Sequence, residues 1–191
     1  MSPGEVELVN LREIDDTLVI DAVYATADNF VNQPLYPANE LFIVPEVGER
    51  LKRVNEALKE KGLRLKVWDA YRPLQVQKKM WELVPDERYV ANPADGSRHN
   101  RGCAVDVTLV DAQGNELAMP TGFDDFSEKA HLDYMDLPEA VIANRQLLIE
   151  AMRQEGFEPL ETEWWHYDAE GWQRYPVLDR NPYGQPLFPD A

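Results

Sequence analysis

The chain contains one cysteine, three histidines and no long apolar segment. Cys103 cannot form a disulfide within the chain, so nothing in the sequence requires an oxidising compartment. No segment approaches the roughly 18–20 apolar residues that a membrane span needs. The acidic start, Met1 to Glu5, lacks the basic and apolar regions of a secretory signal. We therefore expect a cytoplasmic protein.

Basic residues are also few. The chain has 19 Lys and Arg against 35 Asp and Glu, a formal net charge of −16. Nucleic acids and anionic membranes favour basic surfaces, so neither is an expected partner. No linker, repeat or low-complexity segment divides the 191 residues, which predicts one domain over 1–191. The proline-rich residues 171–191 are expected to wrap the surface of this domain.

Hydrophobic periodicity predicts helices and short strands without regular alternation. This pattern favours an α+β fold over a doubly wound sheet. Helices are expected at about 45–61, 73–84 and 138–155, and strands or extended segments at 18–24, 63–68, 104–109 and 157–167.

A first group of metal-ligating residue types lies around the strand predicted at 104–109. In an alternating strand, Asp106 lies on the face opposite Val105 and Val107. His99 precedes it in a loop, and Gly102 allows the backbone to turn between them. The two side chains can therefore converge on one ion. The same spacing also fits a surface-loop histidine and an aspartate bonded to backbone.

The second group is Glu163-Trp164-Trp165-His166. In a straight strand Glu163 and His166 would point to opposite faces. Both can serve one site only if the strand ends, twists or bulges near the tryptophans, or if Glu163 lies beyond the metal ligands as a general base. Alternatively, Trp164 and Trp165 are core aromatics with two polar neighbours. Two imidazoles, one carboxylate ligand and one further carboxylate are what a catalytic zinc ion requires.

The two groups together resemble the zinc D-alanyl-D-alanine dipeptidases of the VanX type. The resemblance rests on Ser97-x-His99-x-x-Gly102-x-Ala104-x-Asp106 and, about 60 residues later, Glu163-Trp164-Trp165-His166. It extends to 24–26, 29–30, 68–73, 123–124 and 156–158, in order, so the resemblance implies a family core at about 20–170. It implies a single α+β domain with a small, mostly antiparallel central sheet and flanking helices, as in hedgehog domains and D-Ala-D-Ala metallopeptidases. It also implies hydrolysis of free D-Ala-D-Ala with one Zn²⁺ per chain.

The resemblance also implies a role for each matching residue. The zinc ligands would be His99, Asp106 and His166. Glu163 would be the catalytic base, and Arg72 would stabilise the oxygen of the scissile carbonyl. Asp124, Ser97 and Tyr71 would lie near the substrate. Asp125 follows Asp124, so either acid could receive the substrate's ammonium group. Cys103 stands where a small residue such as serine is expected.

Other interpretations stay open at this point. Arg72 could be a surface arginine paired with a carboxylate, and His131 lies among acidic residues and is expected to be solvated. The alternative functions are a peptidoglycan DD- or LD-carboxypeptidase or endopeptidase of the same fold, and a non-catalytic zinc-binding module. A small dipeptide is the expected partner. Neither the native metal nor a homo-oligomeric state is decided by the sequence.

Overall fold

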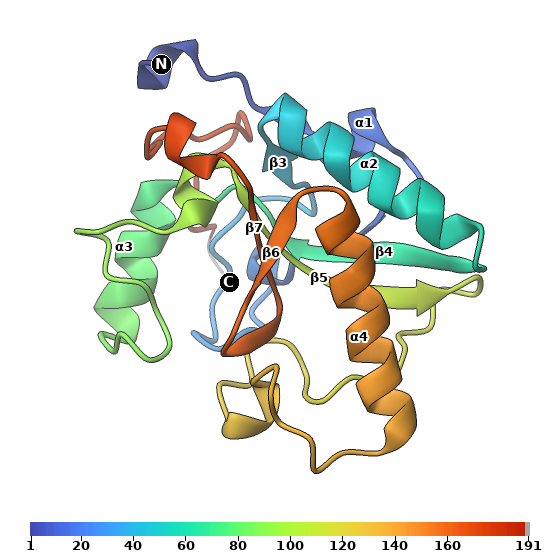
Figure 1. Cartoon of the computed structure of the whole chain (residues 1–191). Helices are drawn as coiled ribbons and strands as arrows, with labels where there is room; N and C mark the ends of the chain where they lie inside the picture. The colour runs from blue at the N-terminus through green and yellow to red at the C-terminus, as the bar shows by residue number, and fades with distance from the viewer. Residues whose placement is uncertain (190–191) are drawn as a thin grey trace.

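The fold is built on a five-stranded sheet with helices packed around it (Figure 1). The computed structural model describes residues 1–189, so the last two residues of the expected surface tail lie outside it. The sheet contains β2 (Val19–Ile20), β4 (Leu63–Asp69), β5 (Ala104–Asp111), β6 (Phe157–Leu160) and β7 (Glu163–Ala169). A separate two-stranded sheet pairs β1 (Val9–Asn10) with β3 (Phe42–Ile43). The helices are α1 (Leu11–Ile14), α2 (Pro45–Lys59), α3 (Leu74–Leu83) and α4 (Glu139–Gln154).

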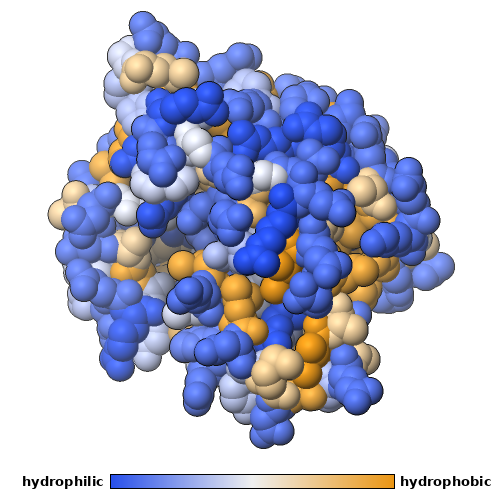
Figure 2. All heavy atoms as spheres, viewed as in Figure 1, coloured by the Kyte–Doolittle hydropathy of each residue, from blue (hydrophilic) through white to orange (hydrophobic). Residues whose placement is uncertain are grey.

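The strand order is β2-β4-β5-β7-β6, and all neighbours are antiparallel except the β2–β4 pair. Helices α2 and α4 pack beside each other against the sheet, and α3 lies apart from both (Figure 1). This arrangement confirms the expected single α+β domain with a mostly antiparallel sheet. No helix among residues 1–189 is long and apolar enough to cross a membrane. The face in Figure 2 is dominated by hydrophilic side chains.

Sequence periodicity located the long helices well. Pro45 is the first residue of α2, a position that needs no backbone N–H. Gly62 follows α2, and Gly156 follows α4, both with positive φ angles of 74° and 80°. Val141, Leu148 and Met152 lie on the buried side of α4, and the last two are completely buried. Local sequence is therefore sufficient to define these helices.

The expected strand at 18–24 is shorter than predicted. Only Val19 and Ile20 pair with β4, after which the chain forms a 3-10 turn at Val23–Ala25. The carbonyl of Tyr24 accepts hydrogen bonds from the backbone N–H groups of Leu35 and Tyr36. These contacts with the following loop draw the chain away from the sheet. They join segments that local periodicity cannot relate.

The tail packs more closely than a surface wrap. Leu178 is completely buried, and Tyr183 is 8% exposed. Leu178 also accepts a hydrogen bond from the N–H of Leu74 and donates one to the carbonyl of Asn100. At the other end of the chain, Leu11 is completely buried as well. The core therefore extends beyond residues 20–170 in both directions.

Gly102 is expected to be necessary for the turn between the two parts of the first motif. Its φ is 69°, and a Cβ atom there would lie 2.9 Å from Val44 Cγ1. Gly114 has a φ of 85° with no atom within 4 Å of such a Cβ, so Gly114→Ala isolates the backbone cost, about 1–2 kcal/mol. Gly102→Ala should lower the free energy of unfolding in urea by more than this control. Equal losses would show that the contact with Val44 is relieved without cost.

Candidate active site

Three adjacent central strands carry a row of polar side chains. Asp106 on β5 is paired in register with Asp69 on β4 and with His166 on β7. Directly paired residues project from the same face of a sheet. All three are at least nine-tenths buried. The strand register therefore places two carboxylates and an imidazole side by side on a rigid support.

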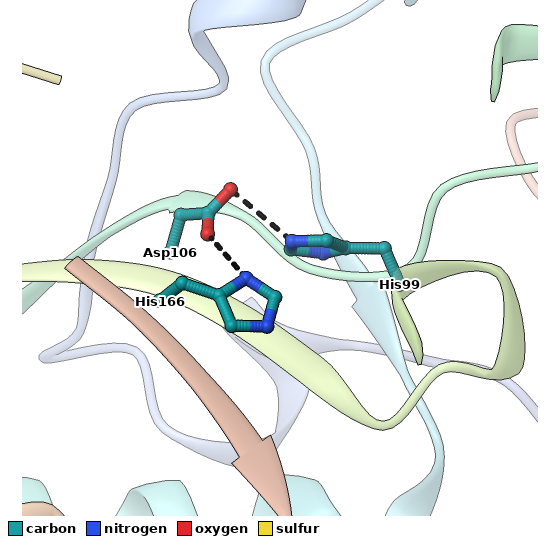
Figure 3. A group of neighbouring side chains, drawn as sticks. All are labelled: His99, Asp106 and His166. Carbon is teal, nitrogen blue, oxygen red and sulfur yellow. Dashed lines mark hydrogen bonds and ion pairs between the residues drawn. The ribbon is translucent and has the colours of Figure 1, made fainter. Parts of the chain in front are cut away.

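His99 reaches this row from the 3-10 turn η3 (Arg98–Arg101). Its Nε2 lies 3.3 Å from Asp106 Oδ2, and His166 Nδ1 lies 3.2 Å from Asp106 Oδ1. One ligand atom from each residue lies within 4.8 Å of the others, and the three side chains converge in Figure 3. Tetrahedral zinc with bonds of about 2.0–2.2 Å separates its ligand atoms by about 3.3–3.6 Å. The donor types and their spacing fit such an ion.

Each imidazole is oriented by a second hydrogen bond. His99 Nδ1 lies 2.8 Å from the carbonyl oxygen of Ala70, so it carries the proton and leaves Nε2 free as a ligand. His166 Nε2 lies 2.8 Å from Asp168 Oδ1, so Nδ1 faces Asp106. Partners of this kind hold metal-bound histidines in place.

Charge interactions inside the cluster are strong. Burial opposes ionisation of Asp106, but the two imidazoles outweigh it and hold its pKa well below the usual range. Burial also lowers the pKa of His166, whereas its hydrogen bonds to Asp106 and Asp168 raise that pKa to about 10. The carboxylates therefore favour a positive charge at this point.

Glu163 joins the cluster through an irregularity in β7. Pro159 pairs with Tyr167, but the next residue of β6, Leu160, pairs with Glu163 rather than with His166. The residues between bulge out of the β6–β7 ladder, which confirms the irregularity expected near the two tryptophans. Glu163 Oε1 consequently lies 4.0 Å from His166 Nδ1. Burial raises the pKa of Glu163, despite the opposing charge of His166.

Arg72 follows β4 and is 8% exposed. Its guanidinium donates to Asp69 Oδ2 through Nε and Nη2, at 3.1 and 2.8 Å, and to Gln77 Oε1 through Nη1, at 2.8 Å. Three of its five N–H groups are thus engaged, which leaves two for another acceptor. Arg72 is paired with a carboxylate, but in the interior rather than at the surface.

Asp124, not Asp125, faces the cluster. It accepts a hydrogen bond from the Tyr24 hydroxyl, whereas Asp125 is exposed and its carboxylate accepts from the N–H of Ser127. Asp124 has a φ of 58°, a left-handed conformation that aspartate tolerates better than most residues. Burial, followed by the negative charge of Asp106, raises the pKa of Asp124 well above its usual range.

These groups line one pocket of about 220 Å³. Sites for drug-sized ligands typically occupy about 300–1,000 Å³, so this pocket suits a smaller molecule. Its walls include Tyr24, Arg72, Ser97, Arg98, His99, Asp106, Asp124, Glu163, His166 and Asp168.

Two expected site residues have other contacts. Ser97 lines the pocket, and its Oγ caps η3 by accepting from the N–H of His99. Tyr71 does not line the pocket, because its hydroxyl donates to the carbonyl of Arg180 and accepts from the Arg180 N–H. Its observed position holds the tail, which corrects the expected placement near the substrate. Cys103 is completely buried, and burial raises the pKa of its thiol to about 12.

Sequence reasoning missed four supporting residues: Tyr24, Asp69, Gln77 and Asp168. Asp168 had a usable signal, because it lies two positions after His166 and shares its face of β7. Tyr24 acts on Asp124, 100 residues away, so no local pattern relates them. Asp69 and Gln77 lie three and five residues from Arg72, but their contacts with it depend on how the chain turns after β4.

Comparisons of the sequence with known proteins identify relatives over most of the chain. A sequence model of the family described as D-ala-D-ala dipeptidase matches residues 4–182. A D-alanyl-D-alanine dipeptidase of Escherichia coli (strain K12) is 37% identical over 90% of this chain and 89% of its own. One from Enterococcus faecium is 32% identical over 96% of this chain and 97% of its own. A D-alanyl-D-alanine dipeptidase of Streptomyces coelicolor is 34% identical over 77% of this chain and 83% of its own. The chain therefore belongs to the D-alanyl-D-alanine dipeptidase family of the M15 peptidases.

Proposed function

We propose that this protein hydrolyses free D-Ala-D-Ala to two molecules of D-alanine, with one Zn²⁺ per chain. The observation that carries the proposal is the convergence of His99, Asp106 and His166 beside Glu163 in a small pocket. Membership of the dipeptidase family supports the choice of substrate. We also assign the cytoplasm as its compartment, on the ground that the one cysteine is buried and unpaired.

His99, Asp106 and His166 would hold the metal through Nε2, a carboxylate oxygen and Nδ1 respectively. When bound, the ion would supply a water molecule of lowered pKa and positive charge beside the scissile carbonyl. A neighbouring base then needs only to lie within reach of that water.

Glu163 lies beside the proposed metal ligands and can accept and release a proton, as this base must. Its carboxylate accepts the proton of the attacking water and delivers it to the leaving amine. Its raised pKa, caused by burial, strengthens it as a proton acceptor. Arg72 contributes its two unengaged N–H groups to the oxygen of the scissile carbonyl, where negative charge develops.

Asp124 provides an anchor for the substrate's ammonium group. Its only hydrogen bond to a described side chain comes from Tyr24, and no ion pair within residues 1–189 involves it. A partly buried carboxylate with a raised pKa gains a compensating charge when an ammonium group binds beside it. The substrate would therefore be a short peptide with a free amino end.

The central test measures release of D-alanine from D-Ala-D-Ala by the wild-type protein, with and without a chelator. We expect turnover that the chelator abolishes and zinc restores. Glu163→Gln should retain bound zinc and lose about 10²–10⁴-fold in kcat, as for other general bases. Metal analysis of the same samples separates loss of the base from loss of the ion.

Alternative activities give different results in that assay. A carboxypeptidase would cleave a longer muropeptide in preference to the free dipeptide, and a non-catalytic zinc module would cleave neither. Hydrolysis of L-Ala-L-Ala but not of D-Ala-D-Ala would contradict the proposed substrate. Unchanged turnover in Glu163→Gln would contradict the proposed base.

The role of Asp124 is tested by comparing it with its neighbour. Asp124→Asn should reduce kcat/KM for D-Ala-D-Ala by about 10-fold or more, because a charge-assisted hydrogen bond is lost. Asp125→Asn, at the exposed next position, should have little effect. If the two variants behave alike, the ammonium group binds elsewhere.

Asp168 is expected to support metal binding through His166. Asp168→Ala should weaken zinc affinity about 10–100-fold, measured by competition with a chelating dye, because His166 loses the acceptor that orients it. Glu158→Ala is the matched control, since Glu158 pairs with Asp168 on β6 but is exposed. Equal affinities in both variants would show that Asp168 does not position the ligand.

A further inference from the structure

Three arginines line the pocket, and they differ in how their charges are used: Arg72, Arg88 and Arg98. Arg72 is held by Asp69 and Gln77. The guanidinium of Arg88 donates to both oxygens of the Asp86 carboxylate. The guanidinium of Arg98 makes no hydrogen bond or ion pair with any residue among 1–189. One cation on the pocket wall therefore lacks a protein acceptor.

Arg98 is exposed, but its backbone and one face of its guanidinium are held by neighbouring residues. It begins η3, between the capping residue Ser97 and the proposed ligand His99. Its backbone carbonyl accepts hydrogen bonds from the N–H groups of Gly102 and Cys103. Its guanidinium carbon lies 4.3 Å from the centroid of the Trp172 ring, a distance typical of cation–π contacts. The indole supports the side chain and leaves its N–H edges available.

The lining of the pocket is mainly acidic, so a free cation there can bind a negatively charged group. Five acidic residues line the pocket: Glu87, Asp106, Asp124, Glu163 and Asp168. A dipeptide brings a carboxylate of its own, which this acidic lining would repel unless a cation receives it. Planar guanidinium groups bind carboxylates through two parallel hydrogen bonds. Arg98 is the lining residue with all of its guanidinium donors unengaged.

We propose that Arg98, resting on Trp172, binds the C-terminal carboxylate of the substrate. This inference rests on the proposed dipeptidase function and deepens it, because it identifies the residue that recognises the second end of the molecule. Asp124 binds the ammonium end of the dipeptide and Arg98 binds its carboxylate end. The peptide bond to be cleaved lies between these two ends. A peptide extended or capped at its C-terminus loses the contact with Arg98.

The test compares D-Ala-D-Ala with D-alanyl-D-alanine amide, which keeps the ammonium group and lacks the carboxylate. Arg98→Gln should lower kcat/KM for D-Ala-D-Ala by about 10-fold, mainly through KM, and leave kcat/KM for the amide nearly unchanged. Arg98→Lys should recover part of the loss, because lysine keeps the charge but not the paired donors. Zinc content measured in each variant confirms that the neighbouring His99 still binds.

Arg101→Gln is the matched control. Arg101 lies on the same turn and over the same indole, 5.1 Å from its centroid, but does not line the pocket. This variant should leave the ratio of the two substrates' kcat/KM values as in wild type. A binding measurement uses the slow Glu163→Gln variant, which keeps the dipeptide intact. Calorimetry should show that the double variant Glu163→Gln, Arg98→Gln binds D-Ala-D-Ala about 10-fold more weakly than Glu163→Gln alone.

The outcomes separate this inference from the function beneath it. Failure of the wild-type protein to hydrolyse D-Ala-D-Ala would overturn the proposed function and, with it, the role of Arg98. Hydrolysis by wild type, combined with equal losses for dipeptide and amide in Arg98→Gln, would overturn the Arg98 inference alone.

Discussion

The register of three antiparallel strands is the constraint on which the site depends. A shift of one residue between β5 and β7 would turn His166 to the opposite face from Asp106. The register is fixed by hydrophobic neighbours on both sides of each polar residue, since Val105, Val107 and Tyr167 are completely buried. Packing of the sheet thus sets the distances between the charged groups. The sheet therefore sets the spacing of two of the three proposed ligands, Asp106 and His166, and His99 joins them from η3.

The charged groups around this row also stabilise one another. Asp69 is completely buried, and its ionised carboxylate would be strongly unfavourable in the interior without charged or hydrogen-bonding partners. It accepts hydrogen bonds from Arg72 and from the Tyr36 hydroxyl. The backbone N–H of Arg72 in turn donates to the carbonyl of His99. Arg72, proposed to act on the scissile carbonyl, and the turn that carries the proposed ligand His99 are therefore held as one unit.

Different parts of the structure were predictable to different degrees, for physical reasons. The helices α2 and α4 follow from local periodicity, and the irregularity of β7 follows from the requirement that Glu163 and His166 share a site. The proposed ligands were found because their types and spacing form a specific motif. The hydrogen bond from Tyr24 to Asp124 and the tail contacts of Tyr71 join segments separated by about 100 residues. Such contacts arise only when the chain folds, so no local pattern encodes them.

The positions of the proposed ligands and of the tail along the chain determine when the site can form during synthesis. The proposed metal ligands are separated by 60 residues between Asp106 and His166, and Leu178 then ties the Asn100 and Leu74 segments together. A nascent chain on the ribosome lacks the complete set of proposed ligands until β7 has left the exit tunnel. Metal capture by the three proposed ligands would therefore come late in synthesis, after most of the chain has emerged.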